Sequence, residues 1–147
     1  MTTTTDRAVS DFCLRLVRTQ QLVQRRLDLA LGEQHGLSFG DFNLLQALAS
    51  APDGALRRID LAKRLGTTAY GVTQLLVPME KVGLVRRHNE TGNASLKQTS
   101  ITAAGAQLLA HATVTAHETC SELLDPALLH QLAPLADAMG SIERAAA

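Results

Sequence analysis

The chain has 147 residues, a formal net charge of zero and a hydrophobic content of 46%. This length fits one domain, or one compact domain with an added dimerisation layer. Aromatic residues make up only 3% of the chain and Trp is absent, so the core has to be built from Leu, Val, Ala and Ile. The frequent Ala and Leu residues favour helices over strands.

Composition and pattern also exclude several classes of protein. Residues 1–11 contain no apolar stretch of the kind found in a signal peptide, and no window approaches the roughly 18 apolar residues of a membrane span. Two cysteines, Cys13 and Cys120, are too few for a disulfide scaffold and fit a reducing compartment. We therefore expect a cytoplasmic protein with no membrane partner.

The zero net charge conceals a segregation of charge along the chain. Residues 55–105 contain eight basic and three acidic side chains, which gives this segment a net charge of +5. The two flanks together carry −5. A basic middle between acidic flanks is typical of a local phosphate-binding surface, although an ordinary solvated surface with chance clustering gives the same count.

The first part of the chain has the apolar spacing of two helices. Apolar residues recur at helical spacing from about residue 8 to residue 32, which predicts one long helix that Gly32 and Gly36 end. Ser38 is suited to be an N-cap and opens a second helix. The apolar face of that helix contains Phe42, Leu45, Leu48 and Ala49. The sequence Ala-Pro-Asp-Gly at 51–54 then predicts a turn.

Two further helices are predicted on either side of a glycine turn. The first spans about 58–65, with Ile59, Ala62 and Leu65 directed inward. Gly66 follows, and Thr67 or Thr68 can cap a longer helix that runs to about Val82, where Gly83 can serve as a left-handed stop. The predicted buried stripe of this longer helix is Val72, Leu75, Leu76, Met79 and Val82. The predicted opposite stripe is Tyr70, Thr73, Gln74, Val77 and Lys81.

The helical period disappears after Gly83. Residues 84–88 and 97–102 flank the polar, turn-rich segment 89–93, which suggests a β-hairpin. Thr102 then caps a helix over about 103–123, and Asp125-Pro126 combines an N-cap with a proline at the first position of a last helix. That last helix contains Leu128, Leu132, Leu135, Met139 and Ile142. The predicted fold is mostly α, with a small β-hairpin wing.

The two helices around Gly66 predict a helix-turn-helix. In this motif the second helix enters the major groove, and its N-terminal residues face the base edges. Gln can pair with adenine through two hydrogen bonds, and Thr can offer a methyl group to thymine or a hydroxyl to phosphate. Basic residues of the hairpin would reach the flanking backbone or the minor groove. The candidate DNA-binding residues are Thr67, Thr68, Ala69, Tyr70, Thr73, Gln74, Lys81, Arg86, Arg87, His88 and Lys97.

The segment from Arg57 to Leu109 resembles the winged-helix core of the multiple-antibiotic-resistance-regulator (MarR) family. The matching features are DLAKRLG, the VTQLL helix, MEKVGLVRR leading into the wing, and ITAAG at the wing exit. The flanking helices are also similar to that family's dimerisation helices, so the resemblance covers nearly the whole chain. It implies a winged helix-turn-helix homodimer that binds a palindromic operator in double-stranded DNA. It further implies a repressor that a small molecule or an oxidant releases.

The chain departs from the family pattern on the DNA-binding surface. The wing usually carries Asp-Arg-Arg where this sequence has Asn93, Ala94 and Ser95, and two often basic helix positions are Gln74 and Pro78. Each arginine missing from a phosphate-binding position lowers the slope of log affinity against log salt by about 0.9. Pro78 also removes a backbone hydrogen bond within the helix. We therefore expect DNA binding that is weaker than in a typical member or differs in specificity.

Apolar stripes at both ends of the chain predict dimerisation. The long first helix and the seam from Leu128 to Ile142 present more hydrophobic surface than the winged helix can cover, unless they simply pack on their own domain. Pairing across a twofold axis would set the two recognition helices about 34 Å apart, one turn of DNA. The predicted organisation is a dimerisation helix at 1–35, a winged helix-turn-helix at 36–102 and further dimerisation helices at 103–147.

Three residues of the first helix, Cys13, Arg15 and Arg18, are candidates for sensing an effector or an oxidant. Cys13 lies where the family's peroxide-sensing branch has its thiol, but the neighbours expected here, Phe39 and Phe42, have no hydroxyl to stabilise a thiolate. The alternative is a small hydrophobic Cys packed in the interface. The arginines at 15, 18, 25 and 26 either line a pocket for an anionic effector or form a solvated face paired with Asp11 and Asp28.

No signature of catalysis or of a metal site is present in the sequence. There is no Ser-His-Asp set, paired carboxylates, phosphate loop or metal-ligand spacing, so we expect neither enzyme activity nor a cofactor. The histidines at 35, 111, 117 and 130 are interpreted as surface or interface residues. The alternative to a repressor is a winged-helix interaction module that has weakened or lost DNA binding and acts through protein contacts. Gln74 and the depleted wing favour that alternative.

Overall fold

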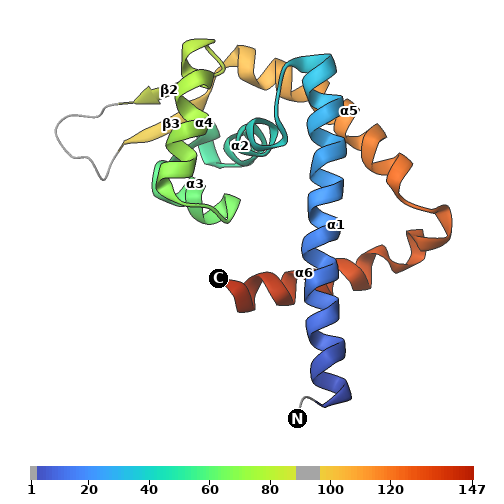
Figure 1. The fold of residues 1–147 in the computed structure, drawn as a ribbon. Helices are drawn as coiled ribbons and strands as arrows, with labels where there is room; N and C mark the ends of the chain where they lie inside the picture. Colours follow the sequence, from blue (N-terminus) through green and yellow to red (C-terminus); the bar gives the residue numbers. More distant parts are fainter. Residues whose placement is uncertain (1–2, 89–96) are drawn as a thin grey trace.

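The computed structural model describes residues 3–88 and 97–147 and has the predicted mostly helical architecture with a small sheet (Figure 1). Its α-helices are α1 (Thr4–His35), α2 (Phe39–Ala49), α3 (Arg58–Leu65), α4 (Ala69–Lys81), α5 (Ala103–Leu123) and α6 (Leu132–Ala146). The 3₁₀ turns are η1 (Pro52–Gly54) and η3 (Pro126–Gln131). Strands β1 (Ala55–Arg57), β2 (Val85–His88) and β3 (Gln98–Ile101) form an antiparallel sheet in the order β1-β3-β2. Strand β1 was not predicted.

Local side-chain signals set most of the helix ends. Ser38 caps α2, because its Oγ accepts a hydrogen bond from the Asp41 N–H while the Asp41 carboxylate accepts one from the Ser38 N–H. Gly66 and Gly83 follow α3 and α4 in the left-handed conformation, with φ of 64° and 79°. The predicted break at Gly32 is wrong. Helix α1 continues through this residue to His35, and the left-handed stop is Gly36.

The core lies where α2, α3, α4 and α5 meet the second half of α1. Its largest fully buried side chains are Leu31, Leu44, Leu45, Leu48, Leu61, Val72 and Leu76. Two predicted inward residues are wrong: Ile59 is 55% exposed and Val82 is 70% exposed. Leu61 is buried on α3 in place of Ile59. Helix α3 has only eight residues, so packing against α2 and α4 decides its inward face more than its own short pattern does.

The start of α5 is fixed to the end of α4. The Thr102 Oγ1 donates a hydrogen bond to the Gly83 carbonyl at 2.6 Å and accepts one from the Gly105 N–H at 3.1 Å. A Cβ at position 105 would overlap the Leu84 carbonyl oxygen, so only glycine allows this approach. These contacts determine where the wing strands leave and rejoin the helical core.

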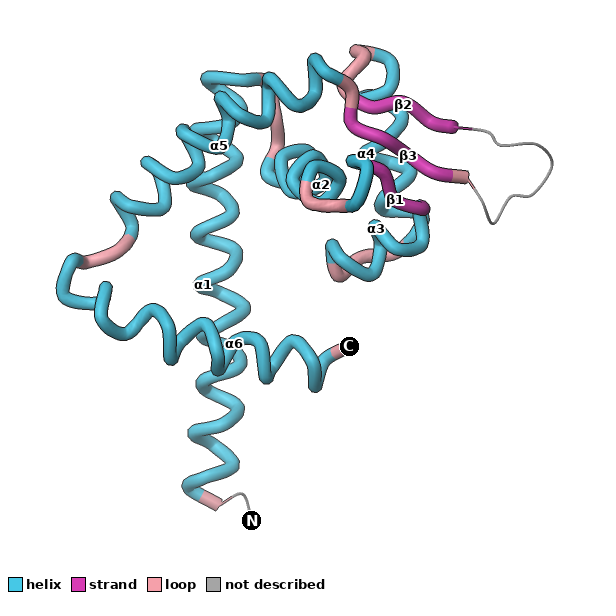
Figure 2. Tube along the Cα trace, turned by 180° about the vertical axis from the view of Figure 1, so that it is seen from behind, coloured by secondary structure: helices cyan, strands magenta, loops and turns pink. Residues whose placement is uncertain are grey.

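Both ends of the chain extend beyond this core. In Figures 1 and 2, the first half of α1 projects away from α2, α3 and the sheet, and α6 runs separately from the core. Residues 4–22 of α1 contain no buried side chain, and neither does α6. The last helix begins at the predicted Asp125 cap, but it is split into η3 and α6 instead of being continuous from Pro126. No helix in the described ranges is both long and apolar enough to cross a bilayer.

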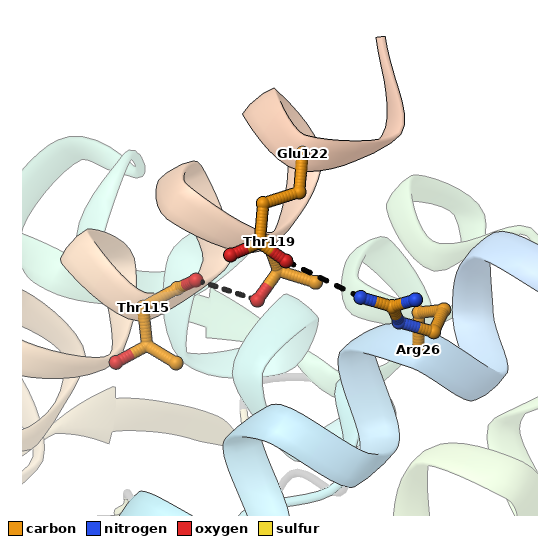
Figure 3. Close-up of polar contacts among 4 residues, drawn as sticks. All are labelled: Arg26, Thr115, Thr119 and Glu122. Carbon is orange, nitrogen blue, oxygen red and sulfur yellow. Dashed lines mark hydrogen bonds and ion pairs between the residues drawn. The ribbon is translucent and has the colours of Figure 1, made fainter.

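Polar contacts join α1 to α5 along their seam (Figure 3). The Arg26 Nη2 lies 3.3 Å from Glu122 Oε2. The Thr115 hydroxyl donates to Gln34 Oε1 on α1 at 3.0 Å, and within α5 the Thr119 hydroxyl donates to the Thr115 carbonyl at 2.8 Å. The suggested pairing of the arginines at 15, 18, 25 and 26 with Asp11 and Asp28 is wrong. Asp11 lies 4.0 Å from Arg7, one turn earlier in the same helix, and Asp28 Oδ1 accepts a hydrogen bond from the Phe39 N–H at 2.7 Å.

Candidate nucleic-acid interface

Helix α4 is held by its cap and by one buried face. The Thr68 hydroxyl accepts a hydrogen bond from the Gly71 N–H at 3.0 Å, which satisfies a donor at the helix start. A Cβ at Gly71 would lie 2.7 Å from Thr67 Oγ1, so this turn is tightly closed. The buried residues of α4 are Val72, Leu76 and Met79. With that face packed on the core, the opposite face is left to solvent.

The exposed face of α4 contains most of the predicted reading residues. Tyr70 is 73% exposed, and Gln74 and Lys81 lie along the same helical stripe. The preceding residues Thr67, Thr68 and Ala69 are also exposed, at the end of α4 that a major-groove helix directs at the bases. Tyr70, Gln74 and Lys81 therefore share one outward side, as the sequence predicted.

Thr73 lies at the edge of this outward face and lines the open groove between α3, α4 and the sheet. Its side chain is half-buried, and its hydroxyl donates a hydrogen bond to the Ala69 carbonyl at 3.0 Å. The same hydroxyl accepts a hydrogen bond from Arg58 Nη1 at 3.2 Å. Thr73 is thus turned toward the start of α3, where it holds an arginine against the recognition helix.

Arg58 is a functional candidate that the sequence analysis missed. It is exposed at the first position of α3, and the contact with Thr73 joins residues fifteen positions apart. Its neighbour Arg57 pairs with Asp60, with Nε 2.7 Å from Oδ2. This hydrogen-bonded pair raises the pKa of Arg57 and lowers the pKa of Asp60. The only signal for Arg58 in the sequence was the basic composition of its segment. Composition cannot predict that the Arg58 side chain contacts Thr73 on the next helix.

An open groove of about 740 Å³ lies between the start of α3, α4 and the sheet. Its cationic lining residues are Arg57, Arg58, Arg87 and Lys97. Its apolar lining includes Ile59 and Leu76. Glu80 reduces the positive charge by pairing with Arg87, whose Nε lies 2.5 Å from Glu80 Oε2. The groove therefore places positive charge directly beside the exposed face of α4.

The predicted basic residues of the wing are divided between two faces of the sheet. Successive side chains of a strand alternate, so Arg87 shares the α4 side with buried Val85, whereas Arg86 and His88 point to the other side. There the His88 Nε2 lies 2.7 Å from Ser100 Oγ. The depleted wing positions Asn93, Ala94 and Ser95 lie outside the described residues.

The sensing candidates on α1 are not assembled into a site within one chain. Cys13 is exposed and lies fifteen residues from Asp28, the partner of Phe39, which corresponds to about 22 Å along the helix. Phe42 is buried in the core, so the predicted Phe39 and Phe42 neighbours of Cys13 are wrong for a single chain. Arg15 and Arg18 line a shallow, open hollow formed by α1 alone.

The histidines likewise form no cluster. Those at positions 111, 117 and 130 are exposed, and His35 Nε2 lies 2.7 Å from Thr115 Oγ1. Within residues 3–88 and 97–147, no three His, Cys, Asp or Glu side chains are arranged to hold a metal ion. The geometry of the described chain thus draws attention to the α3–α4–sheet surface.

Comparison with known proteins agrees with this geometry. Residues 35–93 match the profile of the MarR family. The matched segment includes α2, α3, α4 and β2, and it supports a winged helix of the MarR type. No curated protein matches the sequence.

The likeness extends to both termini of the chain in the solved structures that resemble it. Sco3205, a MarR family transcriptional regulator from Streptomyces coelicolor solved in complex with DNA, superposes with a TM-score of 0.82 at 21% identity, over 100% of this chain and 94% of that one. The regulator BldR from Sulfolobus solfataricus gives 0.80 at 22%, over 95% and 98%. CouR from Rhodococcus jostii RHA1, bound to p-coumaroyl-CoA, gives 0.79 at 19%, over 90% and 91%. In this fold, α3 and α4 are the helix-turn-helix, and β2 and β3 are the wing.

Proposed function

We propose that the chain is a cytoplasmic, homodimeric transcriptional regulator that binds double-stranded DNA sequence-specifically. The observation that carries this proposal is the outward surface on which the α4 stripe lies beside Arg58, Arg87 and Lys97. A helix of this exposure fits the major groove, and cations beside it can contact phosphates and fix its register. The complex of the similar protein Sco3205 with DNA supports the same use of this fold.

A fluorescence anisotropy titration tests DNA binding. The probe is a labelled duplex from the promoter region of the chain's own gene, and a scrambled duplex of equal length and composition is the control. We expect a preference for the promoter duplex and an affinity that falls as salt is raised from about 50 to about 200 mM, because phosphate contacts release counterions. Equal, weak binding of both duplexes at the lower salt would contradict the proposal and favour the interaction module.

Dimerisation is proposed from the exposed apolar side chains at the two ends of the chain. They are Val9, Phe12, Leu14, Val17 and Leu22 on α1, and Leu132, Leu135 and Met139 on α6. Isolated exposed apolar residues are common on soluble proteins, but a continuous series on two helices is typical of an interaction surface. A second copy related by a twofold axis would cover both helices and would match a palindromic operator.

Sedimentation velocity at micromolar concentration tests the dimer. We expect a species with twice the mass of the chain, and we expect Phe12→Asp to shift it toward the monomer because the substitution buries a charge in the interface. Ala110→Asp, on an exposed position of α5, is the control and should leave the mass unchanged. A wild-type monomer under these conditions would contradict the dimer.

The regulatory part of the proposal is repression that a small molecule relieves. CouR was solved with p-coumaroyl-CoA and NadR with 4-hydroxyphenylacetate, so this fold binds aromatic acids and their thioesters in other members. We propose that the chain divides into a dimerisation helix at 1–35, a DNA-binding region at 36–102 and further dimerisation helices at 103–147. Adding phenolic acids and acyl-CoA thioesters to the protein–DNA complex should identify a compound that lowers the anisotropy. A promoter reporter that becomes less active without the protein would contradict repression.

A further inference from the structure

The exposed face of α4, formed by Tyr70, Gln74, Val77, Pro78 and Lys81, has few side chains that can hydrogen-bond to bases. From Thr67 to Met79 the sequence contains no Arg, Lys, Asn, His, Asp or Glu. The polar groups that the exposed stripe offers before Lys81 are the Tyr70 hydroxyl and the Gln74 amide, and its other members are Val77 and Pro78. Thr73 adds no outward hydroxyl, since it is bonded to Ala69 and Arg58. The face thus carries one side-chain amide, Gln74, and the turn that follows it presents the apolar Val77 and Pro78.

Different base pairs are recognised by different types of side chain. Guanine is most often read by Arg or Lys at its O6 and N7 atoms, and cytosine N4 donates to Glu or Asp. Adenine is read by two hydrogen bonds from Asn or Gln, and the thymine methyl group is read by apolar contact. Gln74 therefore suits adenine, and Val77 with Pro78 suits thymine. Glu80, a carboxylate near the face, is paired with Arg87.

The cations lie to the sides of the stripe and not on it. Arg58 is held at the α3 side by Thr73, and Arg87 and Lys97 lie at the sheet side of the groove. Side chains in these places meet the sugar-phosphate backbone, which gives affinity without reading sequence. Affinity and sequence discrimination are therefore assigned to separate sets of residues.

We infer that α4 reads a half-site of A·T pairs, in which Gln74 binds adenine and Val77 and Pro78 contact thymine methyl groups. This inference rests on the proposed DNA-binding function and names the base pairs which that surface selects. The consequence is a specificity that depends on a methyl group. Replacing a contacted thymine by uracil keeps the base pair and removes only that methyl, which is expected to cost about fourfold in affinity per contacted base.

Selection from duplexes with a randomised core tests the inference on the full-length protein. Enriched half-sites with A·T pairs at the centre of each half would support it. Enriched half-sites centred on G·C pairs would overturn the base assignment and leave DNA binding intact. A protein that retains no duplex even at about 50 mM salt would overturn the proposed function as well, because phosphate contacts are strongest there.

Deoxyuridine substitution in the selected site tests the methyl contact directly. Wild-type protein should bind the thymine site more tightly than the uracil site, and Val77→Ser, which removes both methyl groups of the side chain, should bring the ratio at one position close to one. Val114→Ser, at an exposed valine of α5, is the matched control and should keep the wild-type ratio. Equal affinities of the wild type for thymine and uracil sites, or a full ratio at every position in Val77→Ser, would overturn the contact.

Discussion

The winged helix and the terminal helices differ in how they bury their apolar residues. Every large side chain that is fully buried lies between Leu31 and Leu76. The first half of α1 and all of α6 have apolar residues at helical spacing too, yet these remain exposed. The same Leu-rich composition thus gives a closed core in one region and an open surface in the other.

This difference separates two tasks within one chain. The closed core fixes α4 relative to the sheet, because α4 packs through Val72, Leu76 and Met79 while its opposite side stays exposed. The open surface has no such partner within the described residues and is left for a second copy under the proposed function. Paired substitutions, one in each region, should therefore have different effects on folding, dimerisation or DNA binding.

Leu45 and Leu135 should give the largest contrast. Leu45→Ala removes a fully buried side chain and is expected to lower the free energy of unfolding by about 2–5 kcal/mol at any protein concentration. Leu135→Ala removes a half-exposed side chain of α6, so its effect should depend on protein concentration, through a weaker dimer. Urea unfolding at several concentrations measures both. Equal, concentration-independent losses would remove the distinction between the two regions.

Two glycines should respond with opposite signs. Gly105→Ala places a Cβ against the Leu84 carbonyl and is expected to lower the free energy of unfolding by about 3 kcal/mol. At Gly140, in α6, a Cβ would make only ordinary contact with Arg144 Nη1 at 3.5 Å. Gly140→Ala should therefore raise helix stability by about 0.5–1 kcal/mol. Thermal unfolding measures both variants, and a stable Gly105→Ala protein would show that α5 is not fixed to the wing as described.

Two arginines should separate a specific contact from net charge. Arg58→Ala is expected to weaken DNA binding and to lower the slope of log affinity against log salt by about 0.9, the value for one phosphate. Arg7→Ala removes the same charge from α1, far along the chain from the groove, and should leave the slope unchanged. Anisotropy titrations at three salt concentrations measure the slopes. Identical slopes for the two variants would leave Arg58 without a DNA contact.

The smallest expected effect concerns the first turn of α1. Hydrogen bonds from the Thr3 side chain and then from its backbone lower the pKa of Asp6. Because the folded pKa is below the unfolded one, the stabilisation is present above the unfolded value and is lost as the pH falls through the folded value. Thr3→Ala should raise the Asp6 pKa, and Thr5→Ala should not. An NMR titration of the Asp6 carboxyl measures the shift, and an unchanged value in Thr3→Ala would contradict the capping box.

The wing marks a boundary between what local sequence and what packing can specify. The hairpin strands were predicted close to their observed bounds because Gly83 and Thr102 are strong local signals. Strand β1 was missed, since its three residues become a strand only by pairing with β3, more than forty positions later. Pairing of distant segments leaves no trace in a short window of sequence.

The candidate DNA-binding surface was predicted in outline and corrected in detail. Tyr70, Gln74 and Lys81 share the outward face because a helix of known start has a fixed periodicity. The contact between Thr73 and Arg58 could not be predicted from helical periodicity, because it depends on the packing of α3 against α4. The division of Arg86 and Arg87 between two sheet faces follows from strand alternation, once the register of β2 is known.

Local patterns in the sequence were enough to predict the helices, most of their caps and stops, and the basic middle of the chain. Each of these features depends on interactions among residues a few positions apart, and such interactions can be inferred from a short window of sequence. Packing between distant segments was needed to establish that Leu61 and not Ile59 faces the core, that Arg26 pairs with Glu122, and that Arg58 lies against α4. Those outcomes depend on which helices meet and at what orientation, and that is set by the packing of the whole core.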